Sequence, residues 1–234
     1  MRTKTKLSLA GLIAAVAMAA VPAGASATTG TFTSGPGTIP DNSTSLVPVT
    51  VSGLPGVITD VNVTVTEMSH IADGSDIDLL LRNPNGGSVI LLSDAGGADQ
   101  ALTPSNFTFD DAAASLAPST GALSGGTFKP TNYVGAAPEP DTFGGAPAGP
   151  YGSTLAALNG VNANAVWELY ARDDTADSGG SFANYSVTVT TNSSGTPTVG
   201  PKPKKAKKKK KCKPKKKASQ KPKKCKPKKG KPHQ

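Results

Sequence analysis

The stretch between Thr28 and Gly200 has no cysteine, one tryptophan and one histidine. Both cysteines of the protein, Cys212 and Cys225, lie near its C-terminal end, so no disulfide framework can stabilise this stretch. The cysteines also lack the Cys-x-x-Cys spacing of a zinc site, and His233 is the single histidine near them. A fold in the middle of the chain must therefore rest on packing and on any ions it binds. The redox state of the two cysteines stays open, since they can pair with each other, pair between chains or remain reduced.

Long apolar runs are missing after the first 27 residues. At the start, three basic residues precede an apolar run from Leu7 to Ala20, and small residues follow up to Ala27. This is the three-part plan of a secretory signal peptide, and the run is shorter than the about 20 residues that span a bilayer. The sequence predicts a signal peptide over 1–27, cleaved after Ala27, and a secreted or cell-surface product. A retained N-terminal anchor is the alternative.

Basic residues are scarce in the middle of the chain, and acidic residues are missing from its end. Between Thr28 and Gly200 there are 3 basic and 16 acidic residues, a net charge of −13, whereas from Pro201 onward there are 19 lysines and no acidic residue. A segment made almost wholly of Lys and Pro cannot bury a core. The composition predicts a folded domain over 28–191, a linker over 192–200 and a disordered tail over 201–234.

A helical period is also absent from the middle region, where polar and apolar residues alternate. In Val61–Thr66 the valines share one face, and in Asp76–Leu81 the residues Ile77, Leu79 and Leu81 share one face while Asp76 and Asp78 occupy the other. A turn at Pro84–Gly87 leads into Ser88–Leu92 as a hairpin partner. Further strands are predicted over 107–109, 166–171 and 185–191.

These strands predict an all-β protein with a jelly-roll-like antiparallel β-sandwich, an open barrel being the alternative. The Gly- and Pro-rich stretch 121–159 is weakly patterned, and we expect a loop excursion that contains short strands. Trp167 is expected in the core.

Carboxylates gather in the loops of this region. Calcium takes six to eight oxygen ligands, and loops that converge at one end of a sandwich can supply them. The residues selected for such a site are Asp76, Asp78, Asp94, Asp111 and Asp174. The alternative is that these aspartates build turns and keep the surface soluble.

The tail carries lysine without arginine or aromatic residues, a composition suited to sequence-blind, salt-sensitive contact with polyanions. Sequence-specific nucleic-acid binding is therefore not expected. Behind an export signal, an anionic cell-envelope polymer or a membrane surface is the expected partner. A solvated tail without a dedicated partner is the alternative.

Several motifs together resemble the P domain (P/Homo B domain) that follows the catalytic domain of kexin- and furin-like proprotein convertases. They are Ile39–Asn42, His70, Asp76–Leu79, Asn83–Gly86, Trp167–Asp174 and Gly179–Gly180. Three more, Ser93–Gly97, Phe109–Ala112 and Asn159–Asn162, look like secreted bacterial members in which the domain stands outside a protease. The chain departs from the family where Ser75–Ile77 replaces Gly-Asp-Leu with one extra residue, and where Tyr185 replaces a tryptophan.

The resemblance implies a β jelly roll that stabilises and assists an attached subtilisin-like domain. No part of the convertase catalytic domain is present, and His70 is the one histidine available for a Ser-His-Asp triad, without a nucleophile motif nearby. We therefore expect a non-catalytic protein in which His70 makes structural hydrogen bonds. The sequence supports a binding or structural module first. The alternatives are an accessory part of a subtilisin/kexin-like endopeptidase system supplied by a separate protease chain, and a calcium-dependent carbohydrate-binding module.

Overall fold

The computed structural model describes residues 26–133, 141–176 and 178–192. These residues form twelve strands and two short 3-10 helices. In chain order they are β1 (Ala27–Thr33), β2 (Gly37–Ile39), β3 (Ser43–Val51), β4 (Val57–His70), η1 (Gly74–Asp76), β5 (Ile77–Arg82), β6 (Ser88–Ser93), β7 (Leu102–Phe109), β8 (Gly126–Phe128), β9 (Thr131–Asn132), η2 (Leu155–Leu158), β10 (Ala165–Asp173), β11 (Gly180–Phe182) and β12 (Asn184–Asn192).

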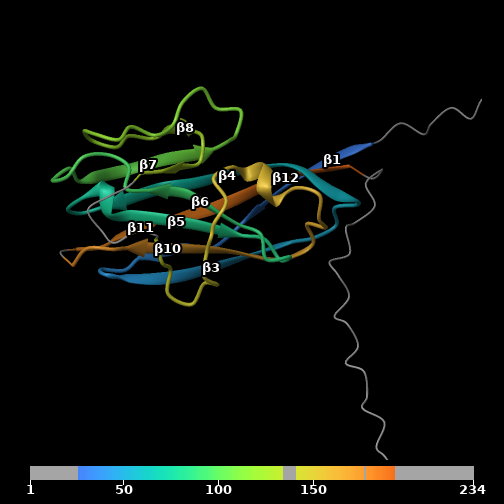
Figure 1. The fold of residues 1–234 in the computed structure, drawn as a ribbon, viewed down its shortest axis with the longest axis horizontal. Helices are drawn as coiled ribbons and strands as arrows, with labels where there is room; N and C mark the ends of the chain where they lie inside the picture. Colours follow the sequence, from blue (N-terminus) through green and yellow to red (C-terminus); the bar gives the residue numbers. More distant parts are fainter. Residues whose placement is uncertain (1–25, 134–140, 177, 193–234) are drawn as a thin grey trace, which may run out of the picture. The chain divides into compact units, whose positions relative to one another are not determined.

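The strands make two sheets. The seven-stranded sheet has the order β1-β12-β4-β11-β2, with β7 paired to β4 and β8 paired to β7, and the five-stranded sheet has the order β3-β10-β5-β6-β9. Within these sheets the strand pairs are antiparallel, apart from the short parallel pairs β6–β9 and β7–β8. The sheets lie face to face (Figure 1), which confirms the predicted β-sandwich.

The alternation along β4 and β12 explains how one face of the larger sheet becomes apolar. Val61, Val63 and Val65 of β4 are buried, while the polar residues between them are only half-buried. On β12 the register places Val187 opposite Val63, so the buried side chains of both strands share a face. Because side chains alternate between the two faces of a strand, this pattern directs one apolar surface toward the second sheet.

The space between the sheets is filled by one continuous apolar core. Trp167 of β10 is fully buried in it, as predicted, and its Nε1 donates a hydrogen bond of 2.8 Å to the Ala163 carbonyl. Tyr185 of β12 is buried as well, and its hydroxyl donates to the Val47 carbonyl at 3.1 Å. Large aromatic side chains are thus buried without leaving their polar groups unpaired.

The predicted strands all lie within observed ones, with a single local difference. Asp76 was expected on a strand beside Asp78, but it lies in η1. The Asp73 side chain accepts a hydrogen bond of 3.0 Å from the Ser75 amide and caps this short turn. Because the turn continues through Asp76, β5 begins only at Ile77, and Asp76 and Asp78 do not share a strand face.

The stretch 121–159 contributes β8, β9 and η2, and its segment 141–153 lies over the outer face of the five-stranded sheet. There Phe143 packs against Leu80, Ile90 and Tyr170, and we call these four residues the outer apolar cluster. The alternation of polar and apolar residues predicts strands with one buried face, yet β5 and β6 are buried on both faces. The second cover comes from a loop whose sequence carries no strand pattern.

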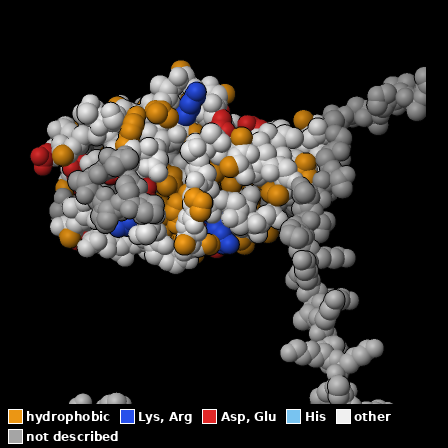
Figure 2. Space-filling model, in the orientation of Figure 1, with side chains coloured by type: hydrophobic (Ala, Val, Ile, Leu, Met, Phe, Trp, Pro, Cys, Tyr) orange, Lys and Arg blue, Asp and Glu red, His pale blue; other side chains and the backbone are white. Residues whose placement is uncertain are grey.

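The predicted signal peptide lies outside the described residues apart from Ser26 and Ala27, as do the tail and the linker beyond Asn192. β1 begins at Ala27, and cleavage after this residue would remove only the first position of the strand. In the part of the chain that is described, no helix is long and apolar enough to cross a membrane. On the face seen in Figure 2, Lys and Arg side chains are few, and hydrophobic side chains occur in small scattered groups.

Candidate functional site

Two of the selected aspartates meet at one end of the β5–β6 hairpin. Asp78 is the second residue of β5, and Asp94 directly follows β6. The antiparallel register pairs Leu79 with Leu92, so the start of β5 lies beside the end of β6. Asp94 has a φ of 51°, the left-handed region that Asp tolerates better than most residues. The hairpin alone therefore brings the two carboxylates together.

The loop after Asp94 is held by its glycines. Gly96 has a φ of 99°, and a Cβ at this position would come within 2.8 Å of the Leu123 side chain. Its amide donates to the Pro118 carbonyl at 2.7 Å, and the Gly97 amide donates to the Gly121 carbonyl at 2.7 Å. Only glycine fits this conformation and this close approach. The Ser93–Gly97 motif thus anchors the loop that carries Asp94.

A third aspartate arrives from the segment 141–153. Arg172 of β10 donates a hydrogen bond of 2.8 Å to the Thr142 carbonyl, and Phe143 packs into the outer apolar cluster. These two contacts directly follow Asp141 in the chain and hold its carboxylate near the start of β5. Asp141 itself is 7% exposed.

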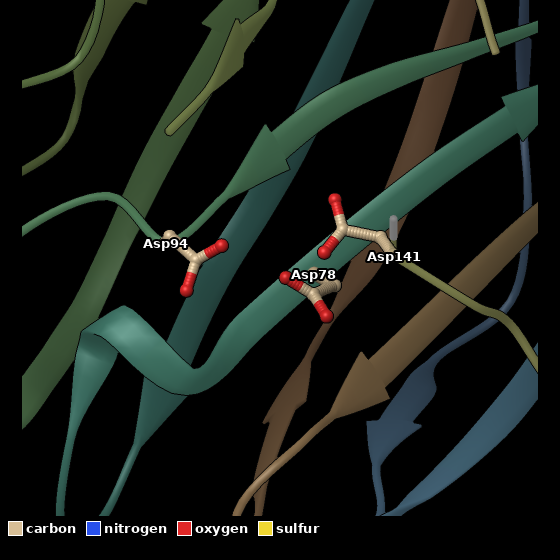
Figure 3. Close-up of side chains that lie close together, drawn as sticks. All are labelled: Asp78, Asp94 and Asp141. Atoms are coloured by element: carbon tan, nitrogen blue, oxygen red, sulfur yellow. The ribbon is translucent and has the colours of Figure 1, made fainter. Parts of the chain in front are cut away.

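The side chains of Asp78, Asp94 and Asp141 form a compact group that we call the carboxylate cluster. One oxygen of each lies within 4.8 Å of the others, and Figure 3 shows the three carboxylates directed toward a common space. The Ser93 hydroxyl donates to Asp94 Oδ2 at 3.1 Å and to Asp141 Oδ2 at 3.0 Å. A hydroxyl has a single hydrogen, so it must be shared between these two acceptors. Among the described residues this is the one group of three His, Cys, Asp or Glu side chains so arranged.

Asp78 is the most deeply buried member of the carboxylate cluster, at 1% exposure. Its Oδ2 atom makes no hydrogen bond, and the Arg172 guanidinium pairs with it only at 3.9 Å. Burial, followed by the negative charges of Asp141 and Asp174, raises the pKa of Asp78 to about 8. Among the described residues, the acidic side chains that act on Asp78 therefore outnumber the basic one that lies within 4 Å of it, Arg172.

The other selected aspartates do not join the carboxylate cluster. Both carboxylate oxygens of Asp111 accept backbone amides at the start of η2, from Leu155 at 2.9 Å and from Ala156 at 2.8 Å. Asp111 therefore serves as a cap. The Asp174 amide donates to the Asp76 carbonyl at 3.3 Å, so these two residues lie together near η1. Burial raises the pKa of Asp174.

His70 ends β4 and lies between the sheets, where it meets Asp173 of β10. Its Nε2 is 2.9 Å from Asp173 Oδ2, and its Nδ1 accepts the Asp73 amide at 3.1 Å. Because Nδ1 accepts, the ring hydrogen is on Nε2 and points at Asp173. Both side chains are fully buried, and both ring nitrogens are occupied. The pair links the two sheets and offers no free nitrogen to a substrate.

A cavity of about 650 Å³ adjoins the carboxylate cluster, and Asp141 is part of its wall. Ile90 of β6, Phe143 and Tyr151 supply apolar lining, and the two rings meet edge to face with centroids 5.8 Å apart. The Tyr151 hydroxyl donates to the Pro147 carbonyl at 2.9 Å, so the segment 141–153 folds back on itself around the cavity. A largely apolar cavity with a few polar groups in its wall is typical of small-ligand sites.

Sequence reasoning missed Asp141. The hairpin turn at Pro84–Gly87 contained the signal for the other two members, since counting back along the paired strands places Asp78 near Asp94. No periodicity marks the stretch 121–159, so nothing in the sequence indicated that Asp141 crosses the sheet to meet them.

No protein-family model matches the chain, and the comparison with curated proteins finds no match. Among solved structures, the chain is similar to one in the crystal structure of Aeromonas sobria serine protease in complex with its chaperone, at 11% sequence identity and a TM-score of 0.34. The match covers 69% of this chain and 27% of that chain. A likeness of this size does not establish a shared family.

Proposed function

We propose that this protein is an exported, non-catalytic P/Homo B-like domain that binds or stabilises a partner, while its polycationic tail holds it to an anionic cell-envelope polymer or membrane surface. The observation that carries this proposal is the separation of charge along the chain. The folded region has 16 acidic and 3 basic residues, so it is repelled by a polyanion, whereas the 19 lysines of the tail are attracted. One chain thus combines a module with its tether.

The non-catalytic part of the proposal is supported by the environment of His70. A general base needs a nitrogen free to take a proton from a substrate or nucleophile. In His70 one nitrogen is hydrogen-bonded to Asp173 and the other to a backbone amide. This arrangement suits a buried link between sheets better than a catalytic group.

The tether is tested by comparing the full chain with a truncation after Gly200 on vesicles that contain anionic phospholipid and on isolated cell-wall polymer. We expect the full chain to bind at low salt and to dissociate as salt rises, because screening weakens lysine contacts. The truncated chain should not bind. A full chain in which every tail lysine is replaced by glutamine is the matched control for length and flexibility. Equal binding by all three proteins would contradict the tether.

A second candidate is an accessory domain of a subtilisin/kexin-like endopeptidase supplied by another chain, which the P-domain-like motifs Asp76–Leu79 and Trp167–Asp174 favour. To test this candidate, the full and the truncated chain are each mixed with a purified exported serine endopeptidase, and the melting temperature of the protease is measured. A rise with both forms supports an accessory role carried by the folded domain. An unchanged melting temperature with both forms argues against it.

A third candidate, calcium-dependent carbohydrate binding, is favoured by the position of Phe143 and Tyr151 beside Asp141. Titration of purified cell-wall glycans into the truncated chain, with calcium and with chelator, tests it. Binding that needs both calcium and Tyr151 supports this candidate, and absence of binding removes it.

A further inference from the structure

The carboxylate cluster has a feature that surface aspartates lack. Asp78 is almost completely buried, its Oδ2 makes no hydrogen bond and has the Arg172 guanidinium only at 3.9 Å, and Figure 3 shows one of its two carboxylate oxygens directed toward Asp94 and Asp141. A buried polar atom without a hydrogen-bond partner is uncommon in native proteins, and a carboxylate oxygen of this kind is well suited to bind a cation. Three carboxylates so close together would also repel one another strongly in the absence of a cation.

The dimensions of the cluster suit an ion at its centre. Two oxygens that each lie about 2.4 Å from a shared calcium ion can be at most about 4.8 Å apart. The ligand atoms of Asp78, Asp94 and Asp141 meet this limit, since they lie within 4.8 Å of one another. Three carboxylates can supply between three and six oxygens, and water completes the remainder.

We infer that Asp78, Asp94 and Asp141 form a structural calcium site that fastens the segment 141–153 to the outer face of the five-stranded sheet. The ligands are all oxygens, which favours calcium over zinc. Magnesium is less suitable because it demands near-ideal octahedral geometry and gives up its water reluctantly. This inference concerns the folded domain alone and does not depend on the tether or on the partner of the proposed function.

A calcium ion would fasten the segment 141–153 to the sheet because its ligands come from two separate parts of the chain. Asp78 and Asp94 belong to the β5–β6 hairpin, whereas Asp141 begins the segment 141–153. Near Asp141, that segment is attached to the five-stranded sheet by the packing of Phe143 and the Arg172 hydrogen bond to Thr142, and at its far end Gly152 pairs with β6 through backbone hydrogen bonds to Ser88 and Ile90. A cation shared between hairpin and segment adds a link at the edge where Asp141 joins the cavity wall.

The groups around Asp78 also define the competing explanation. Asp94 and Asp141 face it from their loops, Arg172 and Asp174 approach from β10 and the residues that follow it, and Ser93 lies between the other two carboxylates. A proton on Asp78 would relieve part of the repulsion without a metal. The experiment must therefore separate a bound calcium ion from a bound proton.

The test uses the full chain, freed of metal with a chelator and then titrated with calcium chloride by calorimetry, with thermal melting in parallel. We expect one saturable calcium site, a higher melting temperature with calcium, and magnesium binding weaker by at least about tenfold. Chymotrypsin cleavage after Phe143 and Tyr151 should slow when calcium is bound.

Asp94→Asn and Asp99→Asn form a matched pair, because both positions have a left-handed backbone, with φ of 51° and 59°. Each substitution removes one negative charge and keeps a residue that tolerates this conformation. Asp94→Asn should weaken calcium binding by at least about tenfold, and Asp99→Asn by less than about twofold. Asp78→Asn keeps the shape of the side chain, so it should fold, and it should also lose the calcium response.

Three results would overturn the inference. The first is the absence of saturable calcium binding in the full chain. The second is equal calcium affinity in the Asp78→Asn, Asp94→Asn and Asp99→Asn variants, which would place the ion elsewhere. The third is a melting temperature that Asp78→Asn raises equally in calcium and in chelator, which would identify the proton as the natural occupant.

Discussion

The two faces of β5 bury different kinds of side chain. On the inner face, Ile77, Leu79 and Leu81 pack into the core between the sheets. On the outer face, Asp78 and Leu80 are equally inaccessible, but they are covered by the segment 141–153 instead of by a sheet. The inner residues make apolar contacts, whereas the outer face encloses a carboxylate whose Oδ2 makes no hydrogen bond. Within this one strand, the inner face therefore contributes to the stability of the core, and the outer face contributes Asp78 to the carboxylate cluster.

The largest expected effect is on the inner face. Leu79→Ala should lower the free energy of unfolding by about 2–5 kcal/mol, because it removes buried apolar atoms and leaves a cavity. Urea unfolding followed by tryptophan fluorescence measures the change, which should be the same in calcium and in chelator. A loss that depends on calcium would mean that the two faces are not independent.

The next effect belongs to the outer face. Calcium at 100 times its dissociation constant should stabilise the full chain by about 2.7 kcal/mol, since only the folded state assembles the carboxylate cluster. Urea unfolding in calcium and in chelator gives the difference. Asp78→Asn should abolish this difference without weakening the metal-free protein, because the amide keeps the shape of the side chain and removes a carboxyl whose charged form is disfavoured by burial and by Asp94 and Asp141. A metal-free Asp78→Asn variant as unstable as Leu79→Ala would remove the distinction between the faces.

A smaller effect is expected from a single buried hydroxyl of the core. Tyr185→Phe removes the hydrogen bond to the Val47 carbonyl and should cost about 1 kcal/mol. Thermal melting in calcium and in chelator provides the measurement. The cost should be equal in the two conditions. A calcium-dependent cost would show that the stability of the core depends on calcium binding at the outer face.

The smallest effect is expected at the other end of the same outer face. Arg82 Nη1 lies 2.8 Å from Glu168 Oε2, and both side chains are partly exposed. Arg82→Ala should cost only about 0.2–1 kcal/mol at low salt, and less at high salt, because solvent screens the pair. Melting temperatures of the variant and the parent protein at two salt concentrations test this. A cost that persists at high salt would show that packing of the arginine stem, not its charge, is what contributes.

The strands could be predicted because their signal is local. The alternation in Val61–Thr66 and in Asp76–Leu81 directs each side chain to a face, and the Pro84–Gly87 turn sets which strand comes next. The exception is Asp76, where the Asp73 cap continues a turn and delays the strand by one residue. Such a cap depends on a hydrogen bond of one side chain, which hydrophobic periodicity does not register.

The carboxylate cluster could be predicted only in part. The sequence predicts Asp78 and Asp94 as calcium ligands, and the β5–β6 hairpin brings their side chains together. Asp111 was selected for the same chemical reason, yet its oxygens are used by backbone amides of η2. An aspartate that caps a turn and one that faces a site look identical in sequence, because the difference lies in which amides come near.

Local sequence is enough to predict the β class of the fold, the inner faces of its main strands and the opposite charges of the middle region and the tail, since each follows from the order of neighbouring residues. Only the tertiary structure decided that the segment 141–153 lies across the five-stranded sheet and brings Asp141 to Asp78 and Asp94. The physical reason is that this contact depends on where a long, unpatterned loop finds apolar surface to cover. That surface exists only once β5, β6 and β10 have paired in the five-stranded sheet.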